Sequence, residues 1–211
     1  MGQKVHPKII RIGISREWSS KWFSDKEYPR FLLEDYKVRK LLEKNHKNAG
    51  ISEVGITRSA NDVKITIHTS KPGILIGRGG AGIEILRKEI ESITKVKTGV
   101  VIEEVVNPDD FAVLVGKNIA EQIEKRIPYR RAVKQSLENV MKSGSRGIRV
   151  RVSGRLNGAE IARSEAFSLG KIPLSSLKED IDYAHVPANT TYGVIGIKVW
   201  VYRKKVQANK I

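Results

Sequence analysis

The chain has 211 residues, 40% of them hydrophobic, which is enough for two compact domains of about 100 residues that each bury a core. Lysine and arginine number 39 against 23 acidic residues, so the formal net charge is +16 and nucleic acid is the expected partner, ahead of an anionic membrane surface. No apolar run long enough to cross a bilayer is present, and the lack of cysteine excludes disulfides, thiol catalysis and thiolate zinc sites and fits a cytoplasmic protein.

The first half of the chain predicts an irregular arm followed by an α+β domain. Residues 1–24 show no clear periodicity, and we expect this N-terminal arm to become ordered only on RNA. The elements predicted after it are a helix at about 28–47, strands around 54–56 and 63–67, a helix at about 81–95 and a strand near 99–106. Asp25 is the expected cap of the first helix. The residues expected on its buried side are Leu32, Leu33, Tyr36, Leu41 and Leu42.

The second half predicts another α+β domain. Asn107-Pro108-Asp109-Asp110 marks the boundary, because proline interrupts regular structure and either aspartate can cap the next helix. The elements expected after it are helices at about 111–126 and 129–143 and strands near 147–154, 160–169, 181–190 and 194–203. The domains are therefore predicted as an arm at 1–24, a first domain at 25–106, a second at 107–206 and a short tail at 207–211.

The most informative short motif is a glycine loop with two interpretations. Gly77-Arg78-Gly79-Gly80 fits the G-x-x-G loop of a KH domain, in which glycines let the backbone approach phosphates beside a helix N-terminus. Gly77, Gly79 and Gly82 also fit the G-x-G-x-x-G turn of a dinucleotide-binding oxidoreductase that would use NAD. The KH interpretation is favoured because the strands before the loop alternate like a half-exposed antiparallel pair. A glycine turn that serves only the fold is the third alternative.

A dense cluster of cations lies between residues 125 and 155, which hold ten basic side chains and one acid, Glu138. On the helix predicted at 129–143, four of them can form a basic ridge: Arg130, Arg131, Lys134 and Lys142. Arg149 and Arg151 share one face of the next strand, and Arg155 follows it. We expect these side chains to contact RNA phosphates, although a solvated surface is the commoner fate of such a run.

Catalytic chemistry finds little support in the sequence. The four histidines lie far apart without metal-ligand spacing, and no G-x-x-x-x-G-K-[ST] phosphate loop is present. We therefore expect no catalytic residue, no metal and no cofactor.

An ordered series of motifs over nearly the whole chain resembles the bacterial-type small-subunit ribosomal protein S-three family. The matching strings are Met1 to Pro7 with Arg11-Ile12-Gly13, Trp18, Trp22-Phe23, Pro72 to Gly80, Tyr129 to Lys134, Val152 to Arg163, Thr190 to Gly196 and Lys198-Val199-Trp200. The resemblance implies a type II KH domain, with a three-stranded sheet and helices. A second α+β domain would follow it, with two helices packed on a mostly antiparallel four-stranded sheet.

The same resemblance implies a function and a set of sites. The family's place is the head of the small ribosomal subunit, where it binds 16S-type rRNA beside neighbouring ribosomal proteins, lines the mRNA entry channel and helps to unwind structured messages. Its helicase-linked cations map onto Arg130, Arg131 and Lys134, and its KH-loop cations onto Lys71 and Arg78. The arm is expected to add RNA contacts at Lys4, His6 and Arg11. In this family the KH loop often carries two basic residues, and the second of these positions is Gly79 here. We therefore expect the loop to bind mRNA less strongly. A free RNA chaperone outside the ribosome is a further alternative.

Overall fold

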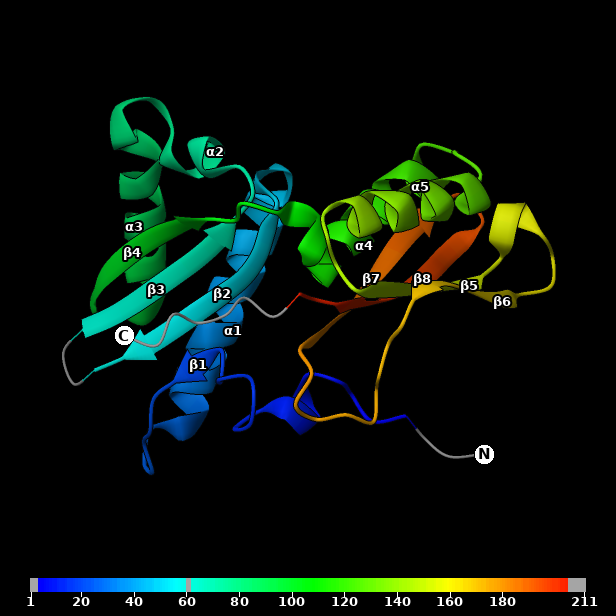
Figure 1. Ribbon diagram of the computed structural model, residues 1–211. Helices are drawn as coiled ribbons and strands as arrows, with labels where there is room; N and C mark the ends of the chain where they lie inside the picture. Colours follow the sequence, from blue (N-terminus) through cyan, green and yellow to red (C-terminus); the bar gives the residue numbers. More distant parts are fainter. Residues whose placement is uncertain (1–3, 60–61, 205–211) are drawn as a thin grey trace. The chain divides into compact units, whose positions relative to one another are not determined.

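The computed structural model describes residues 4–59 and 62–204 (Figure 1). The chain divides at Val106 and Asn107 into two compact units. Residues 18–106 form the first unit, and residues 107–204 together with the arm residues 4–17 form the second. The arm expected at 1–24 is thus shared between the units. The tail expected at 207–211 lies outside the described residues.

The first unit is a mixed sheet with helices on one face. Its elements are β1 (Ser20–Lys21), α1 (Tyr28–Asn45), β2 (Ile51–Arg58), β3 (Asp62–Thr69), α2 (Pro72–Ile76), α3 (Ala81–Thr94) and β4 (Lys97–Glu104). The strand order is β1-β2-β3-β4, with β2 and β3 antiparallel and β3 and β4 parallel. Three long strands and the helices α1 and α3 give the architecture of a type II KH domain, as predicted, and a two-residue strand extends its edge.

The core of this unit lies between the sheet and the helices α1 and α3. Val63, Ile65 and Ile67 alternate along β3 and are buried, because every second side chain of a strand points to the same face. Leu86 and Ile90, one turn apart on α3, pack against them. These two residues therefore mark the face of α3 that points to the core.

The buried face of α1 agrees with the prediction at Leu42 but differs from it over the first half of the helix. Leu32, Leu33 and Tyr36 are exposed. Glu34 and Asp35 are buried instead, because Arg58 of β2 pairs with both carboxylates, at 2.7 Å and 2.6 Å. The expected cap at Asp25 is also wrong, since the N-cap residue is Glu27 and it makes no side-chain cap bond.

The second unit stacks two helices on an antiparallel sheet. Its elements are α4 (Ala112–Glu124), α5 (Tyr129–Lys142), β5 (Gly147–Gly154), β6 (Arg163–Gly170), β7 (Ile181–Thr190) and β8 (Gly193–Tyr202). The strand order is β6-β5-β8-β7, and every neighbouring pair is antiparallel. Figure 1 shows α4 and α5 side by side on one face of this sheet. The core between the layers includes Val115 and Ile119 of α4, Val133 of α5 and Ile148 and Val150 of β5.

The helix α4 begins under a cap that the sequence did not predict. The Ala112 N–H donates to the buried Asp182 carboxylate of β7 at 2.8 Å. Asp110 does not cap the helix. Its carboxylate accepts hydrogen bonds from the Ser143 and Ser145 hydroxyls instead. The expectation that Asp109 or Asp110 caps the helix is therefore corrected to a cap from a strand about 70 residues further on.

The arm residues 4–17 are anchored on the second unit, which differs from the expectation that the arm orders only on RNA. Lys8 lies 2.8 Å from Asp182, and Arg16 lies 2.9 Å from Asp180. Arg11 is fully buried and donates to the carbonyl oxygens of Pro7, Leu174, Ser176 and Glu179. Internal ion pairs and hydrogen bonds thus hold these residues.

Candidate nucleic-acid interface

The glycine loop of the first unit joins two helices. α2 ends at Ile76, and Gly77, Gly79 and Gly80 then adopt positive φ angles of 68°, 62° and 83°. This backbone region is strained for any residue with a Cβ atom, so the path of the loop depends on glycine. Arg78 stands exposed within the loop, and Lys71 stands exposed at the start of α2. The structure therefore brings the predicted KH-loop residues together around one turn.

The helix α3 begins directly behind this loop without a side-chain cap. Unpaired N–H groups and a positive helix end make such a terminus attractive to phosphate. A Cβ atom at Gly82, in the first turn of α3, would lie 2.5 Å from the Leu75 carbonyl oxygen and 2.9 Å from that of Ile76. Gly82 therefore lets α3 approach α2 closely, which fixes the loop between them.

The dinucleotide interpretation of the same glycines fails on this geometry. A dinucleotide-binding turn requires a strand that leads into the glycine loop and a helix that leaves it. Here the segment before Gly77 is the helix α2. Gly82 serves a contact between two helices, and the loop has the helix–turn–helix arrangement of a KH domain.

The basic ridge lies on the exposed side of α5. Tyr129, Val133, Leu137 and other residues bury the opposite side against the sheet, so the orientation of the helix is fixed. The four predicted cations are all exposed: Arg130, Arg131, Lys134 and Lys142. At about 1.5 Å rise per residue, Lys142 lies roughly 16 Å along the helix from Arg131. The first three cations form a compact group, and Lys142 extends the same helix surface.

The cations of the ridge are not equivalent. Arg130 lies 3.1 Å from Glu165 of β6 and donates to the Tyr129 hydroxyl at 3.1 Å. The hydrogen bond from Arg130 lowers the pKa of the Glu165 carboxyl, so this acid stays ionised at neutral pH. Arg131 and Lys134 make no ion pair with any of the described residues. Lys142, further along the helix, is likewise exposed and without an ion pair among the described residues, so these three ridge cations have their full charge available to a polyanion.

A second cationic surface lies on the face of the second sheet that carries no helix. Arg149 and Arg151 of β5 lie opposite Trp200 and Lys198 of β8 in the strand register. The arm borders this surface, and a groove lined by Lys4, Val5, His6, Pro7, Ile10, Arg149, Arg151, Leu174, Ser175, Tyr183, Lys198 and Trp200 runs between them. Four predicted RNA contacts, two from the arm and two from β5, thus converge on one groove.

Two aromatic residues and one further cation line this groove although they were not predicted as site residues from the sequence: Tyr183, Trp200 and Lys198. His6 meets Tyr183 edge-on at a centroid distance of 4.7 Å, and Tyr183 lies 5.2 Å from Trp200. The Arg149 guanidinium lies 5.8 Å from the Trp200 ring. Lys198 adds a charge. The alternation of the strand predicted at 194–203 already puts Lys198 and Trp200 on one face, and that signal could have found them.

Two of the predicted RNA contacts, Arg11 and Arg155, do not line this groove. Arg11 is fully buried, and its donors point to main-chain carbonyl oxygens, so the structure gives it a structural role instead of the expected RNA contact. Arg155 donates to the Ala159 carbonyl at 2.9 Å and lies over the Tyr192 ring at 5.6 Å.

Within residues 4–59 and 62–204, His, Asp and Glu side chains form no group of three or more that could hold a metal ion. In the same part of the chain, no helix combines the length and the apolar character that crossing a membrane requires.

Comparison with known proteins agrees with the two units. A family model described as "KH domain" matches residues 37–110, and one described as "Ribosomal protein S3, C-terminal domain" matches residues 119–201. The proteins called "Small ribosomal subunit protein uS3" of Desulforamulus reducens, Carboxydothermus hydrogenoformans and Streptococcus mutans are 53%, 54% and 48% identical to this chain. Each alignment covers 98% of the chain and 94%, 93% and 95% of the respective relative.

The fold and the cationic surfaces define a KH-domain RNA-binding protein of the ribosomal type. The similarity over nearly the whole length goes further: the chain belongs to the family of small ribosomal subunit protein uS3, a structural and non-enzymatic constituent of the small subunit.

Proposed function

We propose that this chain binds small-subunit rRNA through its KH loop and its groove on the second sheet, and that the ridge on α5 guides mRNA at the entry to the ribosome. The observation that carries the mRNA role is the exposure of Arg131 and Lys134 without ion-pair partners among the described residues. Cations that are fixed in position but not neutralised attract the sugar-phosphate backbone without regard to sequence.

The division of roles follows from how each cationic surface is built. The groove combines lysine, arginine and histidine with aromatic rings, which suits a defined RNA segment that is held permanently. The ridge carries exposed cations, and the aromatic ring that it contacts through Arg130, that of Tyr129, is buried. A surface that holds phosphates but reads few bases lets a strand of any sequence slide past it.

Such a ridge would favour unwinding without energy input of its own. A single strand can approach the cations with its phosphates one after another, whereas a folded hairpin presents them in a fixed double-helical array. Binding the single strand therefore lowers its free energy relative to the hairpin, while translocation supplies the work. The protein contributes a preference between two RNA states and no chemical step.

The test is translation by small subunits that carry Arg130→Ala, Arg131→Ala and Lys134→Ala together. The time to read through a message with a stable hairpin should lengthen, and the time on an unstructured message of the same length should stay unchanged. The matched control removes three exposed lysines from α1, as Lys37→Ala, Lys40→Ala and Lys44→Ala, and should leave the ratio of the two times as in the wild type. An equal effect of the ridge variant on both messages would contradict the mRNA role.

A further inference from the structure

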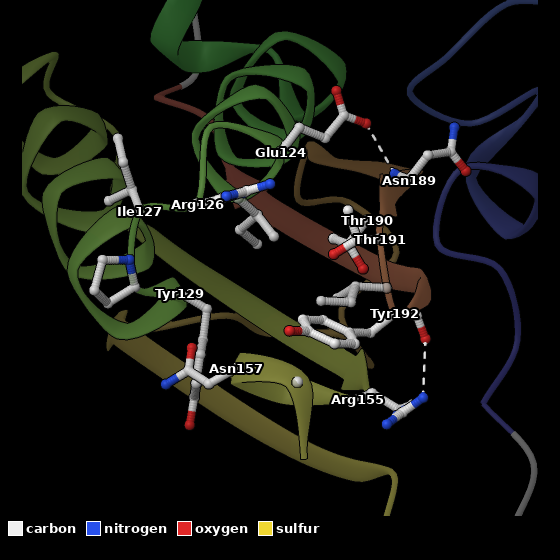
Figure 2. A pocket seen from close by; sticks show the side chains of 14 residues that line it. Glu124, Arg126, Ile127, Tyr129, Arg155, Asn157, Asn189, Thr190, Thr191 and Tyr192 are labelled. Atoms are coloured by element: carbon white, nitrogen blue, oxygen red, sulfur yellow. Dashed lines mark hydrogen bonds between the residues drawn. The ribbon is translucent and has the colours of Figure 1, made fainter. Parts of the chain in front are cut away.

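A pocket of about 530 Å³ lies at one end of the second unit, where three loops meet (Figure 2). The end of α4 and the turn after it contribute residues 123–124 and 126–129, and the turn after β5 contributes Arg155, Asn157 and Gly158. The β7–β8 hairpin contributes residues 189–192 and Ile195. A volume of this size lies in the range of small-molecule sites in proteins. No role follows for this pocket from the KH loop, the ridge or the groove.

Hydrogen bonds hold the three loops in place. The Asn189 N–H donates to the Glu124 carboxylate at 2.8 Å, which ties the end of β7 to the end of α4. The Thr190 hydroxyl donates to the Gly193 carbonyl at 2.7 Å and closes the hairpin. Arg155 donates across its own turn to Ala159 and, at 3.4 Å, to the Tyr192 carbonyl. The pocket is therefore preformed, which reduces the entropy that a ligand would have to remove.

Backbone strain is concentrated at this pocket. Among the described residues, three non-glycine residues have positive φ angles: Lys95 (55°), Arg126 (63°) and Asn157 (55°). Two of the three line the pocket. Arg126 occupies the turn after α4, a position at which helices commonly place glycine because that residue has no Cβ atom to clash. Strained residues of this kind cluster at binding sites, where the position of their side chain is used.

The side chains that face the pocket suit a nucleotide. Figure 2 shows Arg126 and Tyr192 pointing into the space between the loops, with Asn157 beside Tyr129. The Tyr192 side chain is exposed, and one side of its ring packs against the backbone of Gly158, where a Cβ atom would lie 3.0 Å from the ring. Asn157 makes no side-chain hydrogen bond within the described chain. Its amide can both donate and accept, as a base edge requires.

We propose that this pocket binds one unstacked nucleotide of single-stranded RNA. The base stacks on Tyr192, its edge meets the Asn157 amide, and Arg126 holds the adjoining phosphate. The lining holds two arginines, Arg126 and Arg155, against one glutamate, Glu124, whose carboxylate already accepts the Asn189 N–H. This excess of positive charge favours RNA over a protein segment that has few acidic residues.

The site rests on the proposed function, because it adjoins the ridge. Tyr129 lines the pocket, and its hydroxyl accepts a hydrogen bond from Arg130. An RNA strand that follows the ridge can therefore place one nucleotide in the pocket. This contact would add a base-dependent component to binding that is otherwise electrostatic.

The experiment uses the full-length protein and two single-stranded probes. One is a uridine hexamer with 2-aminopurine at one internal position, and the other is the same hexamer with an abasic site there. Stacking on Tyr192 should quench the 2-aminopurine fluorescence, and the hexamer with the base should bind about tenfold more tightly than the abasic one. Equal affinity of the two hexamers, without quenching, would overturn the proposal.

Variants separate stacking, charge and folding. Tyr192→Leu should abolish the difference between the hexamers, while Tyr192→Phe should keep it. Arg126→Gly should weaken both hexamers severalfold without lowering the Tm, because glycine adopts this backbone conformation without strain. Lys95→Gly is the matched control, since it removes one cation from the same left-handed conformation in the other unit, and it should leave binding unchanged. Wild-type behaviour of both Tyr192→Leu and Arg126→Gly would overturn the proposal.

The ridge variant shows which of the two proposals has failed. Replacing Arg130, Arg131 and Lys134 by alanine should weaken both hexamers equally and keep their ratio. If the ridge variant weakens binding but no probe shows base dependence, the proposed function stands and the nucleotide site is wrong. If the pocket variants alter only the content of neighbouring proteins in purified small subunits, the occupant is a protein and the nucleotide site is equally wrong.

Discussion

Asp182 is a buried carboxylate of the second unit that pairs with several cations at once. Its carboxylate caps α4 through the Ala112 N–H and pairs with Lys8 and Arg16 of the arm and with Arg203 after β8. Burial alone would raise the pKa of this carboxyl, but the three cations outweigh burial and lower the pKa to about 2. One acid thus joins the arm, a helix and the last strand.

The depressed pKa predicts how stability depends on pH. The ionised carboxylate stabilises the folded state at every pH above the ordinary value of 3.8, and this contribution disappears as the pH falls towards 2. The shift corresponds to about 2 kcal/mol. Asp182→Asn should lower the free energy of unfolding in urea at pH 7 by about 3 kcal/mol, because it leaves buried cations without their partner.

The same variant should expose the arm to proteases between residues 4 and 17, since Lys8 loses its partner. The difference in unfolding free energy between wild type and variant should shrink as the pH is lowered from 4 to 3. A difference that stays constant from pH 7 to pH 3 would show that Asp182 does not titrate as the structure requires.

Individual side chains also mark the limit of what the sequence could predict. The KH loop and the basic ridge could be predicted from the sequence because each lies in one continuous stretch of chain. The groove required the arm to meet three strands, and the pocket required three loops that are up to about 70 residues apart. The left-handed conformations of Arg126 and Asn157 leave no trace in composition or periodicity. Arg11 was taken for an RNA contact because its burial depends on carbonyl groups far along the chain.

At the scale of elements, periodicity predicted the strands and most helices, because each pattern reports burial on one side. β5 alternates as expected, with Ile148 and Val150 in the core. The pattern misled in the first half of α1, where two carboxylates are buried on the same side as Val38 and Leu42. Arg58 compensates the carboxylates of Glu34 and Asp35, and this pairing across about 24 residues overrides the rule that charged residues face water.

The contact between α2 and α3 gives a prediction for the KH loop. Gly82→Ala would place a Cβ atom 2.5 Å from the Leu75 carbonyl oxygen, so the two helices must move apart. We expect a loss of about 2 kcal/mol in unfolding free energy and weaker binding of rRNA fragments, measured by urea unfolding and by gel shift. Gly79→Ala is the comparison, because no atom lies within 4 Å of its Cβ and only the positive φ opposes it, at about 1 kcal/mol. A Gly82→Ala protein as stable as the wild type would show that α2 and α3 are not held this closely.

At the scale of the whole molecule, the net charge of +16 is concentrated in a few surfaces. Residues 125–155, which include α5 and β5, hold ten cations and one acid and so contribute +9 of it, and the remainder includes the lysines of α1 and the cations of the KH loop. Such a distribution gives strong, salt-sensitive attraction to RNA at particular places. The protein can therefore be held in an RNA assembly at some surfaces while another surface contacts a moving strand.

The salt dependence of RNA binding measures how many cations of the ridge take part. Each phosphate contact with a single strand contributes about −0.7 to the slope of log K against log salt concentration. Alanine at Arg130, Arg131 and Lys134 together should therefore make the slope less negative by up to about 2. The single variant Arg130→Ala should change the slope less than Arg131→Ala, because Arg130 is already paired with Glu165.

The measurement is the binding of an unstructured RNA to the purified protein over a series of salt concentrations. The triple variant of Lys37, Lys40 and Lys44 removes the same charge from α1 and separates a local contact from the effect of total charge. If the two triple variants change the slope equally, net charge alone drives binding and the ridge has no special part in it.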